Sequence, residues 1–323
     1  MTTLAPELTP NHHKLYDLVQ QSPVTHFFSN NGHTVFLKDE TVQSNGSFKL
    51  RGPLNKLRNV EENEPELLHN GVYTASIGNH GQGVALASTY YGLTSHVYLP
   101  RGAAPKKVEA IQNLGGKLKF VNGTVDDALE QAQKDCVENN GLFIHPFDDY
   151  DVIAGNSSIG YEIVDDDTSF DTVFVPVGGG GLLAGVCQAL DARSSATKVF
   201  GVQLEGSNSF TQSVAARRVV ELSEVNNLSD GTAVKRAGAL ALSTVLESPS
   251  FAGMVEVSNQ ELAAALQRLD AESDVVTEMA AGLSLAGVNK CLHSESLPKG
   301  NHLALLTGKH RDQQRFENLL SSD

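Results

Sequence analysis

Short apolar runs rich in β-branched and aromatic residues alternate along the chain with longer segments whose apolar residues recur at helical spacing. Runs of the first kind are typical of buried strands, and segments of the second kind are typical of helices. The predicted strands are residues 34–38, 72–75, 96–99, 117–121, 142–144, 172–177, 199–204 and 303–306. Because strands and helices alternate, the pattern predicts parallel sheets with helices on both faces.

Two of the predicted helices have clear starting signals. Thr124 can cap a helix over residues 126–139, with Asp127 three positions on as its acidic partner. Pro105 suits the first position of a helix over residues 106–114, because a residue there needs no backbone N–H.

The order of the strands indicates how the chain divides. Residues 72–144 contain four predicted strands, and a fresh series of strands and helices starts at residue 172. That second series must share a sheet with residues 34–38, the one earlier strand left over. We therefore expect an α/β protein with two open, parallel-type sheets and flanking helices. A small domain, residues 71–145, is inserted in a large domain of residues 1–70 and 146–323, and the polar stretch 221–238 forms a loop.

Composition narrows the class of protein. The chain has 323 residues, 40% of them hydrophobic, which is enough to bury a sizeable core. Its 24 basic and 38 acidic side chains give a net charge of −14, which disfavours binding to nucleic acid or to anionic lipid. The three cysteines are widely spaced, and no apolar run approaches the ~18 residues of a membrane span. A small-molecule enzyme of the cytoplasm is the expected class.

The segment Gly178–Gly181 carries the clearest chemical signal. Four glycines follow a predicted strand and precede a helix, so backbone N–H groups can converge on an anion without side-chain obstruction. A phosphate site is favoured over a simple tight turn. A dinucleotide site is the alternative, since Gly179, Gly181 and Ala184 fit G-x-G-x-x-A, and Glu205 ends the next strand.

Two further turns contain reactive or polar residues among small ones. Lys49 lies in Ser44-Asn45-Gly46-Ser47-Phe48-Lys49-Leu50-Arg51-Gly52. It is either an ordinary solvated lysine or, if this tight turn desolvates its amine, a residue suited to Schiff-base chemistry. Ser76-Ile77-Gly78-Asn79-His80-Gly81-Gln82-Gly83 follows a strand and opens a helix, which suits a carboxylate or an ordinary helix cap.

Together these three segments resemble the fold type II pyridoxal-phosphate enzymes, in the threonine/serine dehydratase and serine racemase group. The lysine, Ser-Ile-Gly-Asn-His and tetraglycine segments stand in the family's order, and the resemblance spans about residues 34–308. It implies the tryptophan synthase beta-like fold, pyridoxal 5′-phosphate as cofactor, an amino-acid substrate and a homodimer.

The resemblance also implies roles for individual residues. Lys49 and Ser76 are catalytic, with Lys49 holding the cofactor as a Schiff base and then removing the Cα proton of the substrate. Asn79 bonds the ring hydroxyl, Thr307 bonds the pyridine nitrogen, and Phe48 packs on the ring. The phosphate lies on Gly178, Gly179, Gly180 and Gly181, and the substrate on Ser76, Ile77, Asn79 and His80.

The implied reaction is β-elimination (dehydration and deamination) of a hydroxy amino acid such as threonine, serine or 3-hydroxyaspartate to a 2-oxo acid and ammonia. The alternatives on the same fold are β-replacement and amino-acid racemisation. More distant ones are an NAD-dependent dehydrogenase and a binding module that kept the fold.

Three positions depart from the family pattern. Ile77 stands where serine racemases carry an acid–base serine, which predicts elimination without efficient racemisation. Glu205 and Ser209 fit a divalent-cation site of many relatives, but Thr211 stands in place of the aspartate of that site. We therefore expect this chain to bind a divalent cation only weakly. Lys309 and His310 replace the usual Gly-Asn after Thr307-Gly308.

Overall fold

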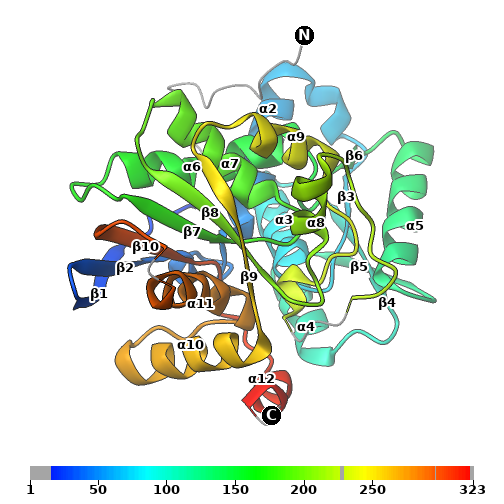
Figure 1. The fold of residues 1–323 in the computed structure, drawn as a ribbon. Helices are drawn as coiled ribbons and strands as arrows, with labels where there is room; N and C mark the ends of the chain where they lie inside the picture. Colours follow the sequence, from blue (N-terminus) through cyan, green and yellow to red (C-terminus); the bar gives the residue numbers. More distant parts are fainter. Residues whose placement is uncertain (1–15, 226–228, 295, 321–323) are drawn as a thin grey trace. The chain divides into compact units, whose positions relative to one another are not determined.

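A computed structural model describes residues 16–225, 229–294 and 296–320, and it confirms an α/β protein with two mostly parallel sheets and flanking helices (Figure 1). The described chain forms two compact units. Unit 1 contains residues 16–20 and Lys49–Asn156, and unit 2 contains Gln21–Phe48 and the described residues from Ser157 onward. None of the helices in the described part of the chain has the length and apolarity that a bilayer crossing requires.

Unit 1 is built on a four-stranded parallel sheet. The strand order is β5 (Lys117–Val121), β4 (Ser95–Pro100), β3 (Val72–Ala75) and β6 (Leu142–Phe143). Side chains alternate between its faces, as the period of a strand dictates. Tyr73 and Tyr98 pack on helix α5 (Val125–Glu138), while Val97 and Leu99 pack among residues of α3 (Asn79–Tyr90) and α4 (Pro105–Asn113).

The predicted helix starts in this unit are confirmed. The Thr124 hydroxyl accepts from Asp127 N at 3.3 Å, and the Asp127 carboxylate accepts from Thr124 N at 2.6 Å, which together cap α5. Pro105 is the first residue of α4.

The expected small domain, residues 71–145, lies within unit 1, which also takes residues 49–70 and 146–156. Unit 1 extends beyond the expected small domain because α2 (Arg51–Asn63) packs closely on its neighbours. This helix lies against α3, and at the start of α6 (Tyr150–Val164) a Cβ on Gly155 would overlap the Arg51 carbonyl. The short 3-10 helices η2 (Phe48–Leu50) and η3 (Pro65–Leu68) stand on either side of α2.

Unit 2 is built on a six-stranded sheet. Its order is β1 (Val24–Asn30), β2 (His33–Asp39), β10 (Gly300–Leu306), β7 (Thr172–Pro176), β8 (Lys198–Leu204) and β9 (Phe251–Val257). Only β1 runs antiparallel. The predicted sharing of one sheet by residues 34–38 and the second half of the chain is confirmed. Strands β1 and β9 were not predicted, because both are sheet edges whose residues are largely half-buried or exposed.

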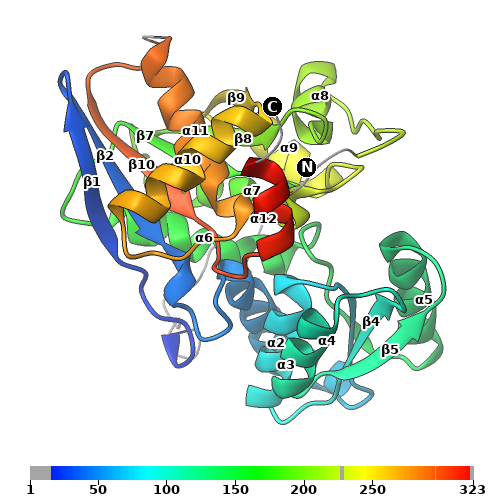
Figure 2. The same ribbon diagram turned by 90° about the horizontal axis from the view of Figure 1, so that it is seen from below.

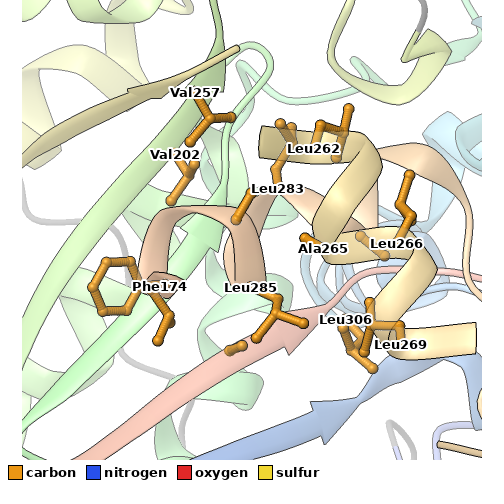
Figure 3. Close-up of a cluster of buried hydrophobic side chains, with 14 of the residues drawn as sticks. Phe174, Val202, Val257, Leu262, Ala265, Leu266, Leu269, Leu283, Leu285 and Leu306 are labelled. Carbon is orange, nitrogen blue, oxygen red and sulfur yellow. The ribbon is translucent and has the colours of Figure 1, made fainter. Parts of the chain in front are cut away.

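Helices cover both faces of this sheet (Figures 1 and 2). Val202 contacts Gly287 of α11 (Met279–His293), whereas the adjacent Gly201 contacts Leu183 of α7 (Gly181–Ala192), so α11 and α7 lie on opposite faces. Figure 3 shows the core on the α11 side, where Phe174 and Leu306 of the sheet meet side chains of α10 (Asn259–Glu272) and α11. The remaining elements of the unit are η1 (Glu40–Val42), α8 (Ser209–Ala216), η4 (Asp230–Thr232), α9 (Ala239–Glu247) and α12 (Gln313–Leu320). Within the loop expected at 221–238, residues 226–228 lie outside the described residues.

A buried histidine, His302, and its half-buried neighbour His33 predict acid sensitivity of this sheet. His302 Nε2 lies 3.0 Å from His33 Nδ1, and His302 Nδ1 lies 2.8 Å from the Thr172 hydroxyl. Burial and then the nearby His33 lower the pKa of His302 to about 4, while Asp171 acts in the opposite direction. Because an unfolded histidine titrates near ~6.5, the unfolded state binds more protons between about pH 6.5 and 4, and stability falls as the pH falls through that window.

We expect His302→Asn to remove this contribution. The number of protons taken up on unfolding in this pH window should fall by about one, so the free energy of unfolding should depend less steeply on pH. Urea titrations at intervals from pH 7 to pH 4 measure the difference. Equal pH dependence in both proteins would show that His302 does not carry it.

Candidate active site

Lys49 is held at both ends within unit 1. Its Nζ donates a hydrogen bond to the Pro146 carbonyl at 2.8 Å. Its own backbone carbonyl lies against α3 so closely that a Cβ on Gly83 would overlap it. The flanking Phe48 and Leu50 are buried, so Lys49 occupies an apolar turn with its amine in a defined position.

The turn from Ser76 to Gly78 connects the end of β3 to the start of α3. Ser76 Oγ accepts from Gly78 N at 3.1 Å, and a Cβ on Gly81 would lie 2.7 Å from the Ser76 carbonyl, so only a glycine lets the first turn close this tightly. Ser76, Ile77 and Asn79 are half-buried. Because N–H groups and the positive end of the helix dipole gather here, the turn suits a carboxylate.

Two histidines lie beside these residues. His80 is buried and donates from Nε2 to the Ile144 carbonyl at 3.1 Å. Burial, with help from the charge of Lys49, lowers the pKa of His80 to about 3. His145 accepts from Phe147 N and Asp148 N through Nδ1, and burial lowers the pKa of His145 as well. Both rings are therefore neutral near pH 7, and they place no positive charge beside the Lys49 amine.

In unit 2, the four glycines form a backbone cradle at the end of β7. Gly180 has φ +96° and is the N-cap of α7, and a Cβ at this position would overlap the Phe210 ring. A Cβ on Gly178 would lie 3.3 Å from the Gly231 carbonyl. Consecutive N–H groups at the positive end of a helix, with no side chains between them, fit a phosphate group.

Thr307, also in unit 2, lies beyond the end of β10 in a well-defined environment. Its hydroxyl donates to Glu278 Oε1 at 3.1 Å, and its carbonyl accepts from Phe48 N at 3.1 Å. Glu278 in turn donates from its backbone N to the Gly308 carbonyl at 2.9 Å. Thr307 is buried and is oriented by a carboxylate that the sequence analysis did not single out.

Comparison with known proteins identifies the family. Residues 16–308 match the family described as pyridoxal-phosphate dependent enzymes. The chain belongs to this family. The match favours a pyridoxal-phosphate site over a dinucleotide site at Gly178–Gly181.

Relatives and solved structures agree with the match. An L-threonine ammonia-lyase of Thermotoga maritima is 38% identical over 80% of this chain and 63% of the relative. A threonine dehydratase of Nicotiana attenuata is 37% identical over 94% of this chain, and the chain spans only half of that relative's length. The structure of the processed form of threonine deaminase isoform 2 from Solanum lycopersicum superposes with a TM-score of 0.90 at 32% identity, covering 96% of this chain and 90% of the other.

The residues expected to hold a divalent cation do not fit one in this pyridoxal-phosphate-dependent enzyme. Thr211, which replaces the aspartate, donates from both N and Oγ1 to Gln203 Oε1, at 2.8 and 3.0 Å. The Ser209 carbonyl accepts from Ser213 Oγ at 2.6 Å, and Glu205 is exposed. Among the described residues, no three His, Cys, Asp or Glu side chains form a metal-binding group. A hard cation would find one carboxylate here, so no step is assigned to it.

Lys309 and His310 contact the turn that precedes Phe48 in unit 2. Lys309 N donates to the Gly46 carbonyl at 3.0 Å, and His310 Nε2 donates to the Asn45 carbonyl at 2.7 Å. The side chain of Lys309 covers Gly46, which has φ +72°. These two residues therefore hold the turn at residues 44–47 in shape.

Within each unit, the structure brings some predicted site residues together. In unit 1, Lys49 lies close enough to His80 for its charge to lower the pKa of that ring, and His80 is in the first turn of the helix that follows Ser76. In unit 2, Gly178–Gly181 form one cradle, and Thr307 contacts the backbone of Phe48. The sequence analysis missed His145 and Glu278. The run His-Pro-Phe-Asp-Asp at 145–149, directly after a predicted strand, was the available signal for His145.

Proposed function

We propose that the protein catalyses the β-elimination of a hydroxy amino acid, yielding a 2-oxo acid and ammonia. The observation that carries this proposal is the fixed Lys49 amine, 2.8 Å from the Pro146 carbonyl. Pro146 follows the carboxyl end of β6, and the Ser76–Asn79 turn follows the carboxyl end of the neighbouring parallel strand β3. The names of the relatives support the same reaction and favour L-threonine as substrate.

The family resemblance assigns the residues that would bind the cofactor. The backbone N–H groups of Gly178–Gly181 would hold its phosphate, and Asn79 and Thr307 would bond polar atoms of its ring. Phe48 would supply an apolar contact. When bound, pyridoxal phosphate acts as an electron sink that weakens the bonds at Cα of an amino acid.

The chain's own residues would do the positioning and the proton transfer. Ser76 and the start of α3 would hold the substrate carboxylate, with Ile77, Asn79 and His80 completing that site. The amine of Lys49 would act as the base that removes the Cα proton, as the family resemblance implies. Loss of the β-hydroxyl as water, followed by hydrolysis, gives the 2-oxo acid and ammonia.

Ile77 favours elimination over racemisation. A racemase needs a second acid–base group on the face of Cα opposite the lysine, and an aliphatic side chain has no proton to exchange. We also propose that the protein is a cytoplasmic homodimer, which the family resemblance supports.

The test is a screen of the purified holoenzyme with both stereoisomers of threonine, serine and 3-hydroxyaspartate. Ammonia and 2-oxo acid are measured by coupled assays, and the enantiomers of serine by chiral chromatography. We expect ammonia release from at least one hydroxy amino acid, with serine racemised far more slowly. Absence of ammonia, racemisation faster than elimination, or formation of a β-substituted amino acid in the presence of sulfide would each contradict the proposal.

A further inference from the structure

His80 is a buried group whose contacts join the two segments that hold Lys49. It lies in the first turn of α3, and its ring is 3% exposed. Helix α3 is also the element that packs on the Lys49 backbone through Gly83. From this helix His80 reaches across to the Ile144 carbonyl, 64 residues away in the sequence.

The segment on the other side of this contact holds the Lys49 amine. Ile144 follows β6, and Pro146, two residues on, accepts the hydrogen bond from Lys49 Nζ. His145 keeps this segment folded, because its Nδ1 accepts from the backbone N–H groups of Phe147 and Asp148. The backbone of Lys49 is thus fixed by α3, and its amine by the 144–148 segment.

We infer that His80 is a positioning residue for Lys49. Its hydrogen bond to Ile144 sets the distance between the helix that holds the lysine backbone and the carbonyl that holds the lysine amine. This inference rests on the proposed function in assigning Lys49 as the base, and it adds a residue whose side chain acts through Lys49.

The state of the ring suits this role. Nε2 must carry the proton to donate to Ile144, and Nδ1 has no hydrogen-bond partner among the described residues. A second proton would therefore be buried without an acceptor and would add a positive charge near the lysine. Burial lowers the pKa of His80 to about 3, so the ring stays neutral near pH 7 and Nε2 keeps its proton for the Ile144 carbonyl.

Thr74 provides a matched control. Its hydroxyl donates to the same Ile144 carbonyl at 2.9 Å, but it comes from strand β3 and not from α3. If His80 only satisfied a buried carbonyl, Thr74→Val and loss of the His80 donor would have similar effects. If His80 couples α3 to the 144–148 segment, only the His80 change should move the lysine amine.

The experiment compares His80→Phe, His80→Gln, His80→Asn and Thr74→Val. Phenylalanine keeps a ring without a donor, glutamine can place an N–H near the Nε2 position, and asparagine is too short to do so. The first readout uses the cofactor-free protein. The rate of Lys49 acetylation across a pH series, measured by mass spectrometry against exposed Lys119, reports the position and basicity of the amine.

We expect His80→Phe and His80→Asn to change the Lys49 acetylation rate more than about threefold and to lower kcat about 10- to 100-fold, with a much smaller effect on KM. His80→Gln should restore both quantities to near wild type, and Thr74→Val should leave both unchanged. If His80→Phe does not fold, the Gln and Asn variants still decide the matter.

Equal acetylation rates in wild type and His80→Asn would overturn the inference, as would a folded His80→Gln that behaves like His80→Asn. Failure of the proposed function looks different. In that case the wild-type holoenzyme releases no ammonia from any hydroxy amino acid, while the acetylation comparison in the cofactor-free protein still reports on His80.

Discussion

Replacing Lys49 by alanine is expected to abolish the visible absorbance of the purified protein near ~410–420 nm, which comes from cofactor bonded to a lysine. Ammonia release should fall by about 10³-fold or more, because the same amine serves as the base. The amine occupies a defined position against the Pro146 carbonyl, which alanine leaves empty. Absorption spectra, and mass spectrometry of the Lys49 peptide after borohydride reduction, measure the loss.

The control for this experiment is Lys119→Ala, at an exposed lysine of the edge strand β5 in the same unit. It should keep both the absorbance and the activity. A Lys49→Ala protein that retains the band, or a borohydride adduct on another lysine, would contradict the assignment of Lys49.

The variant with the next largest expected effect is Gly180→Ala, which should weaken binding of the cofactor's phosphate group. The residue has φ +96°, and its Cβ would overlap the Phe210 ring, so both the backbone and the neighbouring helix must move. Backbone strain of this kind costs about 1–3 kcal/mol. We expect weaker binding of pyridoxal phosphate by at least tenfold, roughly 1.4 kcal/mol, together with a lower melting temperature. Titration of the cofactor-free protein with pyridoxal phosphate measures the first quantity.

Two companion variants separate the causes. Gly102→Ala, where an added Cβ meets nothing within 4 Å, should be close to wild type in both measurements. Adding Phe210→Ala to Gly180→Ala removes the steric overlap and leaves the positive φ. Unchanged cofactor affinity in Gly180→Ala would show that the cradle does not depend on this backbone conformation.

Much of the fold follows from local sequence patterns. Each predicted strand overlaps a strand of the structure, and α4 and α5 start where Pro105 and Thr124 predicted. The missed strands β1 and β9 are both edges, where one side has no neighbour and apolar residues are not required. The sharing of a sheet by β2 and β10, whose paired residues are more than 260 positions apart, was predictable only because no other strand was left.

By itself the sequence determined the local features of this protein: where strands and helices fall, the lysine in an apolar turn, and the glycines after Pro176. Tertiary structure alone decided which groups meet that lysine. Pro146 is 97 residues from Lys49, and Ile144 is 64 residues from His80. Periodicity reports which face of an element is buried, but contacts over such separations depend on the order of strands in the sheet and on close helix packing, which no local pattern contains.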